Sequence, residues 1–183
     1  MTNHLEQITA ADFFVVPTVT GRVLFVLVLL AHHRRRVVHV AATAHPTAAW
    51  TAQQIREAFP WKVAPRYLLH DRDCSFAGLD ATTEAMAITN VVTAPRSPWQ
   101  NAYVERFIGS IRRECLDHVI IFTEAGLQRV LTGYVEYYER SRTHLALDKD
   151  APAARPVSPA SAGRIIAIPQ MNGLHHRYER RAA

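Results

Sequence analysis

The chain has 183 residues, of which 49% are hydrophobic and 20% are charged, so it is long enough for one domain with a core and has the composition of an ordinary globular protein. Its longest apolar run, Val23 to Ala31, is about half of what a membrane-spanning helix requires, which excludes an apolar helix that crosses a membrane. The formal net charge of +5 is compatible with a polyanionic partner but does not demonstrate one.

The cysteines and the first residues exclude two further classes of protein. Cys74 and Cys115 do not make a disulfide framework, and neither lies in a C-x-x-C pattern. We therefore expect reduced thiols in a cytosolic protein. Residues 1–7 are polar and lack the apolar core of a signal peptide.

The first third of the chain predicts three strands joined by short links. The middle one is nearly all Val, Leu and Phe, as expected of a strand that is buried on both faces. Tight links between consecutive strands favour an antiparallel meander. The three predicted strands are Asp12 to Val19, Arg22 to Ala31 and Arg36 to Ala42.

A strand–helix–strand alternation is predicted next. Thr47 is positioned to cap a helix over residues 48–59, and Pro60 ends it. Three further elements follow: a strand over 66–70, a helix over 80–88 and a strand over 90–93. Three strands followed by this alternation are the element order of a ribonuclease-H-like α/β fold, with a mixed five-stranded sheet flanked by helices.

Two more helices and an irregular end complete the predicted organisation. The helices cover about Trp99 to Val119 and Thr123 to Tyr138, and the chain becomes rich in Pro and Ala after Ser141. We expect residues 1–145 to form the core, and residues 146–183 to form a Pro/Ala-rich linker and a basic C-terminal tail rather than a core element.

Three acidic residues stand out because of the elements that carry them. Asp12 lies in an apolar strand, Asp71 ends another strand, and Glu105 lies on a helix that is otherwise apolar and basic. A buried carboxylate is costly unless it finds a partner, so the alternatives at Asp12 are a metal ion and a strand-end hydrogen bond. Oxygen-only ligands suit Mg²⁺ or Mn²⁺. Asp73 competes with Asp71 as the second acid, since both follow the same strand.

The ordered acids sit in motifs that resemble a known family, the catalytic core (integrase core domain) of DDE transposases and retroviral-type integrases, in the bacterial insertion-sequence branch. The resemblance covers roughly Asp12 to Val157, and 33 residues separate Asp71 from Glu105, close to the family's usual mid-thirties. Its most specific segments are residues 12–14, 70–73, 94–106 and 111–118, with a later match over 137–144.

The resemblance implies a site and a reaction. Asp12, Asp71 and Glu105 would be the catalytic residues and would hold two Mg²⁺ or Mn²⁺ ions about 3.5–4 Å apart for in-line attack at phosphate. The reaction would be metal-dependent cleavage that leaves a DNA 3′-end, followed by strand transfer, with the element ends and the target DNA as partners. A homodimer or higher oligomer, no membrane and a place at the bacterial nucleoid are also expected. The candidate DNA-binding residues are Trp99, Asn101, Arg106, Arg112 and Arg113, although surface charge explains Arg112 and Arg113 equally well.

Two geometric consequences follow from the implied site. Asp12 and Asp71 must lie on adjacent strands for the three carboxylates to converge, and repulsion among them should raise at least one pKa in the absence of metal. Tyr103, at the start of the same helix, is expected to pack against the core rather than to contact DNA.

The chain also departs from the family pattern. Related transposases carry a helix-turn-helix region ahead of the core, whereas Asp12 follows Met1 almost at once, so we expect a truncated reading frame or a shortened chain. The alternative functions are a ribonuclease-H-like nuclease that does not join strands, a non-catalytic DNA-binding remnant of a transposase and, more distantly, a two-carboxylate glycosidase.

Overall fold

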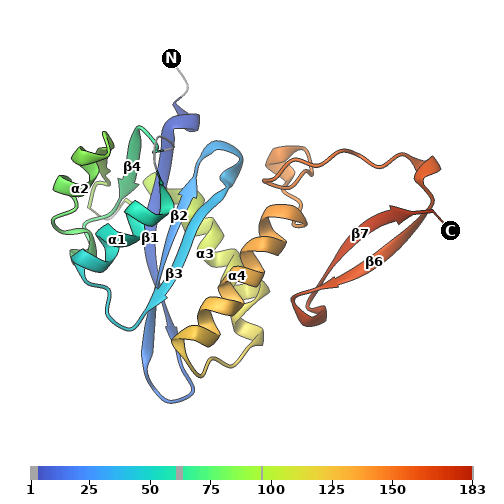
Figure 1. Cartoon of the computed structure of the whole chain (residues 1–183), viewed down its shortest axis with the longest axis horizontal. Coiled ribbons are helices and arrows are strands. Elements are labelled where there is room, and N and C mark those ends of the chain that lie inside the picture. The colour runs from blue at the N-terminus through green and yellow to red at the C-terminus, as the bar shows by residue number, and fades with distance from the viewer. Residues whose placement is uncertain (1–3, 61–63, 96, 183) are drawn as a thin grey trace. The chain divides into compact units, whose positions relative to one another are not determined.

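The computed structural model describes residues 4–60, 64–95 and 97–182. The chain divides into two compact units, residues 1–129 and 130–183, and the division falls within one helix (Figure 1). The sequence analysis placed a boundary at residue 145 instead, and that boundary stays a prediction.

A mixed five-stranded sheet forms the first unit, as the sequence predicts. Strands β1 (Ile8–Pro17), β2 (Val23–Ala31) and β3 (Val37–Thr43) form the antiparallel meander. β4 (Tyr67–His70) and β5 (Thr89–Val92) add to it in parallel, and the strand order is β3-β2-β1-β4-β5. β1 begins four residues before the predicted start at Asp12, because Thr9 to Ala11 are buried and pair with the end of β2.

Helices cover both faces of this sheet (Figure 1). α1 (Ala48–Ala58) is capped as predicted, since the Thr47 hydroxyl accepts a hydrogen bond from the Trp50 amide at 3.2 Å. Ile55 of α1 packs with Ala11, Leu27 and other buried side chains of one face. α2 (Asp80–Ala85) ends earlier than the predicted residue 88, because Ala87 adopts a left-handed backbone with φ of 56°.

α3 (Ala102–Glu114) packs against β1 and β2 on the opposite face. The single helix predicted over residues 99–119 is divided into three pieces, with short 3₁₀ turns at Pro98–Asn101 and Leu116–His118 on either side of α3. The backbone of Cys115, at φ −141° and ψ −64°, ends α3. Its buried thiol and the His118 ring, which hydrogen-bonds the Arg113 carbonyl, hold the chain in this turn.

α4 (Glu124–Arg140) crosses the division between the two units. Within the first unit its Gln128 side chain donates to the Val40 carbonyl and accepts from the Ala42 amide, so it pairs with β3 as a strand would. Leu127 is fully buried, as the helical spacing of apolar residues predicts.

The second unit contains an element that the sequence analysis did not predict. β6 (Arg164–Gln170) and β7 (His175–Arg181) form an antiparallel hairpin within the predicted tail. Its turn passes through Met171, Asn172 and Gly173, all with positive φ, and so contains the Asn-Gly pair that is typical of hairpin turns. The ring of His175 stacks on Tyr137 at a centroid distance of 4.2 Å, which ties the hairpin to the end of α4.

Candidate active site

Strand pairing brings the three predicted acids to one place. β1 and β4 are adjacent and parallel, with Ala10 opposite Leu69. Asp12 lies two residues after Ala10, within β1, and Asp71 lies two residues after Leu69, directly after β4. The predicted adjacency of the strands that carry Asp12 and Asp71 is therefore confirmed. Glu105 lies in the first turn of α3.

A cavity of about 470 Å³ connects these residues. Asp12, Asp71 and Glu105 all line it, together with Asp73, Arg72 and Asn101. Residues 93–95 and Ser97 form another wall, and the Gln100 side chain holds Ala94 by accepting a hydrogen bond from its amide at 2.7 Å. Sequence reasoning missed Gln100 because nothing local links it to a residue six positions earlier.

The electrostatics of the cavity are those of acids without enough counter-charge. Burial and the nearby Glu105 carboxylate raise the pKa of Asp12 from its ordinary 3.8 to about 7, and Asp71 and Asp73 add to the rise. The Phe13 amide, which donates to Asp12 at 2.8 Å, acts in the opposite direction. The predicted rise of at least one pKa is confirmed, and its largest cause is burial rather than repulsion alone.

Asp71 and Asp73 each accept a hydrogen bond from a different backbone amide. Asp71 accepts from the Asp73 amide at 3.0 Å, and Asp73 accepts from the Ser75 amide at 2.7 Å. Asp73 is thus the N-cap of the following 3₁₀ turn. His70, just before Asp71, is buried against Phe76 and hydrogen-bonds the Asp71 carbonyl at 2.7 Å, which fixes the peptide that follows the strand.

The donor set fits a hard divalent cation. Carboxylate oxygens are the ligands that Mg²⁺ and Mn²⁺ prefer, and the raised pKa of Asp12 shows that its charge lacks compensation. Among the described residues, no three His, Cys, Asp or Glu side chains are already grouped closely enough to hold a metal ion. The carboxylates thus face one cavity without forming a closed ligand shell, so an ion would have to draw them together.

The predicted DNA-binding residues differ in how they are presented. Trp99 is 70% exposed, and Arg106 and Arg113 lie on the surface. Arg112 instead lies over the Phe14 ring at 5.2 Å and donates to the Val15 carbonyl at 3.2 Å, so it ties α3 to β1. Asn101 is 5% exposed and faces the cavity.

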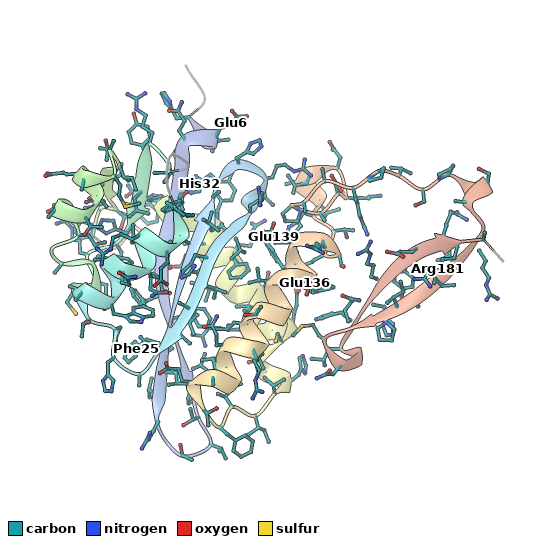
Figure 2. The ribbon with its side chains drawn as sticks, in the orientation of Figure 1. Glu6, Phe25, His32, Glu136, Glu139 and Arg181 are labelled. Atoms are coloured by element: carbon teal, nitrogen blue, oxygen red, sulfur yellow. The ribbon has the colours of Figure 1, made fainter. Side chains whose placement is uncertain are left out.

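Tyr103 packs as the sequence analysis expected. Its half-buried ring meets the His32 ring edge-to-face at a centroid distance of 4.8 Å, and the Arg35 guanidinium lies 5.2 Å from its centroid. His32, which Figure 2 labels, follows β2, and burial lowers its pKa. This contact anchors the start of α3 on the side away from Glu105.

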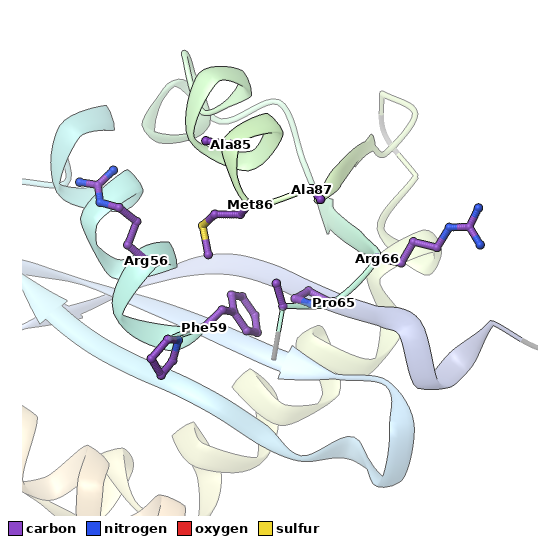
Figure 3. Close-up of a pocket in the computed structure, with 9 residues that line it drawn as sticks. Arg56, Phe59, Pro65, Arg66, Ala85, Met86 and Ala87 are labelled. Carbon is purple, nitrogen blue, oxygen red and sulfur yellow. The ribbon is translucent and has the colours of Figure 1, made fainter. Parts of the chain in front are cut away.

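A second cavity, of about 680 Å³, lies between the ends of α1 and α2 and the start of β4. In Figure 3 the Met86 side chain points toward Phe59, and the Arg66 guanidinium points away from both. The described residues that line this cavity include no carboxylate, so it does not compete as a metal centre. No helix in the described part of the chain is long and apolar enough to cross a membrane.

Comparison with known proteins agrees with the geometry. Residues 86–152 match the family described as integrase core domain. The chain is 25% identical over 150 residues to an uncharacterized 31.7 kDa protein of insertion element IS407 from Burkholderia multivorans, covering 81% of this chain and 54% of that protein. It spans about half the length of the curated relatives that it matches.

Solved structures show the same fold. The HTLV-2 integrase catalytic core domain in complex with magnesium matches with a TM-score of 0.61 at 12% identity, over 80% of this chain and 93% of that one. The catalytic domain of the Mos1 mariner transposase matches with a TM-score of 0.58 at 17% identity, over 72% of this chain and 71% of that one. The predicted ribonuclease-H-like fold class and the resemblance to the integrase core domain are confirmed.

Proposed function

We propose that this chain, whose residues 86–152 match the integrase core domain family, is the catalytic domain of a DDE-type polynucleotidyl transferase, with Asp12, Asp71 and Glu105 as its catalytic acids. The observation that carries the proposal is the shared cavity: three acids from two adjacent strands and a helix line it, and burial with Glu105 raises the pKa of Asp12 to about 7. Acids at such separate places in the sequence have no local reason to meet.

The proposed reaction is an in-line displacement at phosphorus, carried out twice. In the first, a water oxygen bonds to the phosphorus of a DNA phosphodiester, the bond to the 3′-oxygen breaks, and a 3′-hydroxyl is released. In the second, the oxygen of that 3′-hydroxyl bonds to the phosphorus of a target phosphodiester, the bond from that phosphorus to the target 3′-oxygen breaks, and the target strand is left with a free 3′-hydroxyl. Two Mg²⁺ or Mn²⁺ ions, when bound, would activate the attacking oxygen and stabilise the leaving one.

The residues of this chain supply the setting for both steps. Asp12, Asp71 and Glu105 would hold the ions. Burial and the Glu105 carboxylate raise the pKa of Asp12 to about 7, so a cation would compete with a proton for this carboxylate. The hydrogen bond from the Asp73 amide orients Asp71, and the contact of Arg112 with β1 keeps α3, and therefore Glu105, against the sheet.

DNA, as element ends and as target, is the proposed partner. Exposed Trp99, Arg106 and Arg113 are placed to meet bases and phosphates, whereas Arg112 already has protein partners. We also propose a homodimer or higher oligomer, since the HTLV-2 catalytic core has been solved in a dimeric and a trimeric form. A place at the bacterial nucleoid would follow from DNA binding.

A cleavage and joining assay tests the proposal. The purified chain is incubated with supercoiled plasmid and a labelled oligonucleotide that bears a free 3′-hydroxyl, with Mg²⁺, with Mn²⁺ and with a chelator. We expect metal-dependent nicking and joining, which Glu105→Gln reduces at least about a hundredfold, a loss typical of a disrupted metal site. Glu84→Gln, a change of the same kind on the exposed surface of α2, should retain the wild-type rate.

Two outcomes count against the proposal. Metal-dependent nicking without any joining would reassign the chain to the nucleases, and metal-independent nicking that Glu105→Gln leaves unchanged would remove the carboxylate site from the reaction altogether.

A further inference from the structure

Asn101 occupies a helix-capping position but does not cap the helix. It directly precedes α3, where an Asn side chain usually accepts a hydrogen bond from an amide of the first turn. No such bond is found among the described residues at this helix start. The side chain is turned inward instead and is 5% exposed.

The inward orientation is set by a contact with β1. The Asn101 amide nitrogen, Nδ2, donates to the Ala11 carbonyl at 3.3 Å. A backbone carbonyl accepts hydrogen bonds and cannot donate, so the nitrogen must face Ala11 and the side-chain oxygen must face the other way. The orientation of this amide therefore follows from the chemistry of its partner.

The side-chain oxygen of Asn101, Oδ1, has no hydrogen-bond partner in the described part of the chain, although it is buried. Asn101 also lines the cavity that holds Asp12, Asp71 and Glu105. A buried acceptor left without a donor is costly, and unlike other such atoms in the described part of the chain this one belongs to a residue of the cavity, where a bound group could satisfy it. Phosphate oxygens are also acceptors, so a DNA phosphate cannot satisfy Oδ1, whereas an O–H or N–H donor or a cation can.

The position of Asn101 links two of the three acids. Ala11 directly precedes Asp12 on β1, and Glu105 lies four residues after Asn101, which is about one helical turn. The hydrogen bond to Ala11 thus joins the segment that carries Glu105 to the strand that carries Asp12. Two carboxylates that repel each other need such a tie to stay at a fixed separation.

We propose that Asn101 is a positioning residue of the site: Nδ2 holds the Glu105 turn against β1, and Oδ1 accepts a hydrogen bond from the hydroxyl that attacks phosphorus. The inference rests on the proposed function. Water in cleavage and the DNA 3′-hydroxyl in strand transfer are both O–H donors, so one acceptor serves both steps. A neutral amide suits this place, because it receives the hydrogen bond without adding a further negative charge beside DNA.

The test compares two variants of Asn101 with a matched control. Asn101→Leu keeps the branched shape and removes both polar atoms, whereas Asn101→Asp keeps an oxygen at the position of Oδ1 and places a second acceptor against the Ala11 carbonyl. Asn90 on β5 is the control, since its Nδ2 also donates to two side chains and its Oδ1 is also buried without a partner among the described residues. Asn90 does not line the cavity, so Asn90→Leu removes comparable side-chain hydrogen bonds at a place away from the acids.

Two readouts are needed, and the first requires no DNA. In a thermal-shift titration with Mg²⁺ alone, we expect Asn101→Leu to weaken Mg²⁺ binding about tenfold. At saturating Mg²⁺ we expect both cleavage and joining to slow about 10- to 100-fold, the range typical of residues that position metal ligands through hydrogen bonds. Asn90→Leu should lower the melting temperature without changing the Mg²⁺ affinity or either rate. Asn101→Asp should retain Mg²⁺ binding but slow both reactions.

The outcomes separate this inference from the proposed function. Wild-type Mg²⁺ affinity and wild-type rates in Asn101→Leu would overturn the inference even if Glu105→Gln is inactive. A loss confined to joining would assign Oδ1 to the 3′-hydroxyl, and a loss confined to cleavage would assign it to water. If Asn101→Leu does not fold, wild-type rates in Asn101→Asp would equally overturn the proposal that the Asn101–Ala11 hydrogen bond positions Glu105. If the wild-type protein cleaves no DNA, the Mg²⁺ titration still tests whether the Asn101–Ala11 hydrogen bond supports metal binding.

Discussion

The cavity of the first unit and the hairpin of the second unit concentrate charge of opposite sign. Four acids and one arginine are among the described residues that line the cavity, a formal charge of −3. The hairpin of β6 and β7 contains four arginines and one glutamate, a formal charge of +3, and Arg164 stands directly opposite Arg181. Like charges at opposed strand positions are unfavourable, so each region carries a local electrostatic cost.

The two regions relieve that cost by different chemistry. A carboxylate can take up a proton, and the pKa of Asp12 rises to about 7 for this reason. A guanidinium cannot lose its proton at any pH that a protein tolerates, so the hairpin relies on solvent, on the ion pair of Arg177 with Glu179 and on the Arg180 hydrogen bond to the Gly163 carbonyl. Figure 2 labels Arg181, which belongs to the exposed end of β7. The cavity is therefore sensitive to pH and cations, and the hairpin to polyanions and salt.

The largest expected difference between the regions is their response to Mg²⁺. Ligand binding to the folded state at 100 times its Kd stabilises a protein by about 2.7 kcal/mol. Asp12→Asn should abolish this gain in the free energy of unfolding, whereas Arg181→Ala should retain it. Thermal or denaturant unfolding with and without Mg²⁺ measures the effect. A Mg²⁺-induced gain that persists in Asp12→Asn would place the ion outside the cavity.

The next expected difference is in pH dependence without metal. Asp12 binds its proton more tightly in the folded state than in the unfolded state, so its contribution to stability is complete below about pH 4 and is lost as pH rises through about 7. Between those values the wild-type protein should lose at most about 1.4 kcal/mol per pH unit relative to Asp12→Asn. Urea unfolding of both proteins from pH 4 to pH 8 measures the difference. Parallel curves for the two proteins would show that Asp12 titrates normally.

Salt dependence of DNA binding should distinguish the hairpin from α3. Each phosphate neutralised adds about −0.9 to the slope of log K against log salt on duplex DNA. Arg164→Ala/Arg181→Ala should therefore reduce the slope by nearly two units. Arg112→Ala/Arg113→Ala should reduce it by about one, because Arg112 is bound to Val15 and Phe14. Fluorescence anisotropy with a short duplex measures both, and an unchanged slope in the hairpin variant would show that DNA binds elsewhere.

The smallest expected effect is within the hairpin itself. Arg164→Glu replaces a like-charge cross-strand pair with an opposite-charge pair, which should stabilise the hairpin by roughly 0.2–1 kcal/mol. The same change should weaken DNA binding. Hydrogen exchange of the β7 amides reports the stability of the hairpin. Faster exchange in Arg164→Glu would show that the Arg164–Arg181 pair does not destabilise the hairpin.

The same two regions show how much the sequence could predict. The acids of the cavity were identifiable because each lies in or beside an apolar element, where an unpaired charge is energetically costly. The elements around them also have simple patterns, since β2 is buried on both faces and the Thr47 cap precedes an amphipathic helix. These features are local, and they determined most of the sheet.

The hairpin was not predictable by the same rules. Arginines occur on both of its faces, and Ile165 and Ile166 are adjacent, so the alternation of polar and apolar residues is lost. Its turn does contain a typical pair, Asn172-Gly173, but without flanking alternation this signal did not identify the strands. The inward turn of Asn101 depends on Ala11, ninety positions away, so the local capping rule that applies to Asn fails there.

Location of the metal in a crystal tests the central claim most directly. Crystals of the protein soaked in Mn²⁺ give anomalous difference peaks that identify the ion without reference to the protein atoms. The account predicts peaks within the cavity, with oxygens of Asp12, Asp71 and Glu105 at about 2.0–2.6 Å, the range for hard divalent cations. Full Mn²⁺ occupancy elsewhere on the protein, with no peak between these three acids, would contradict it.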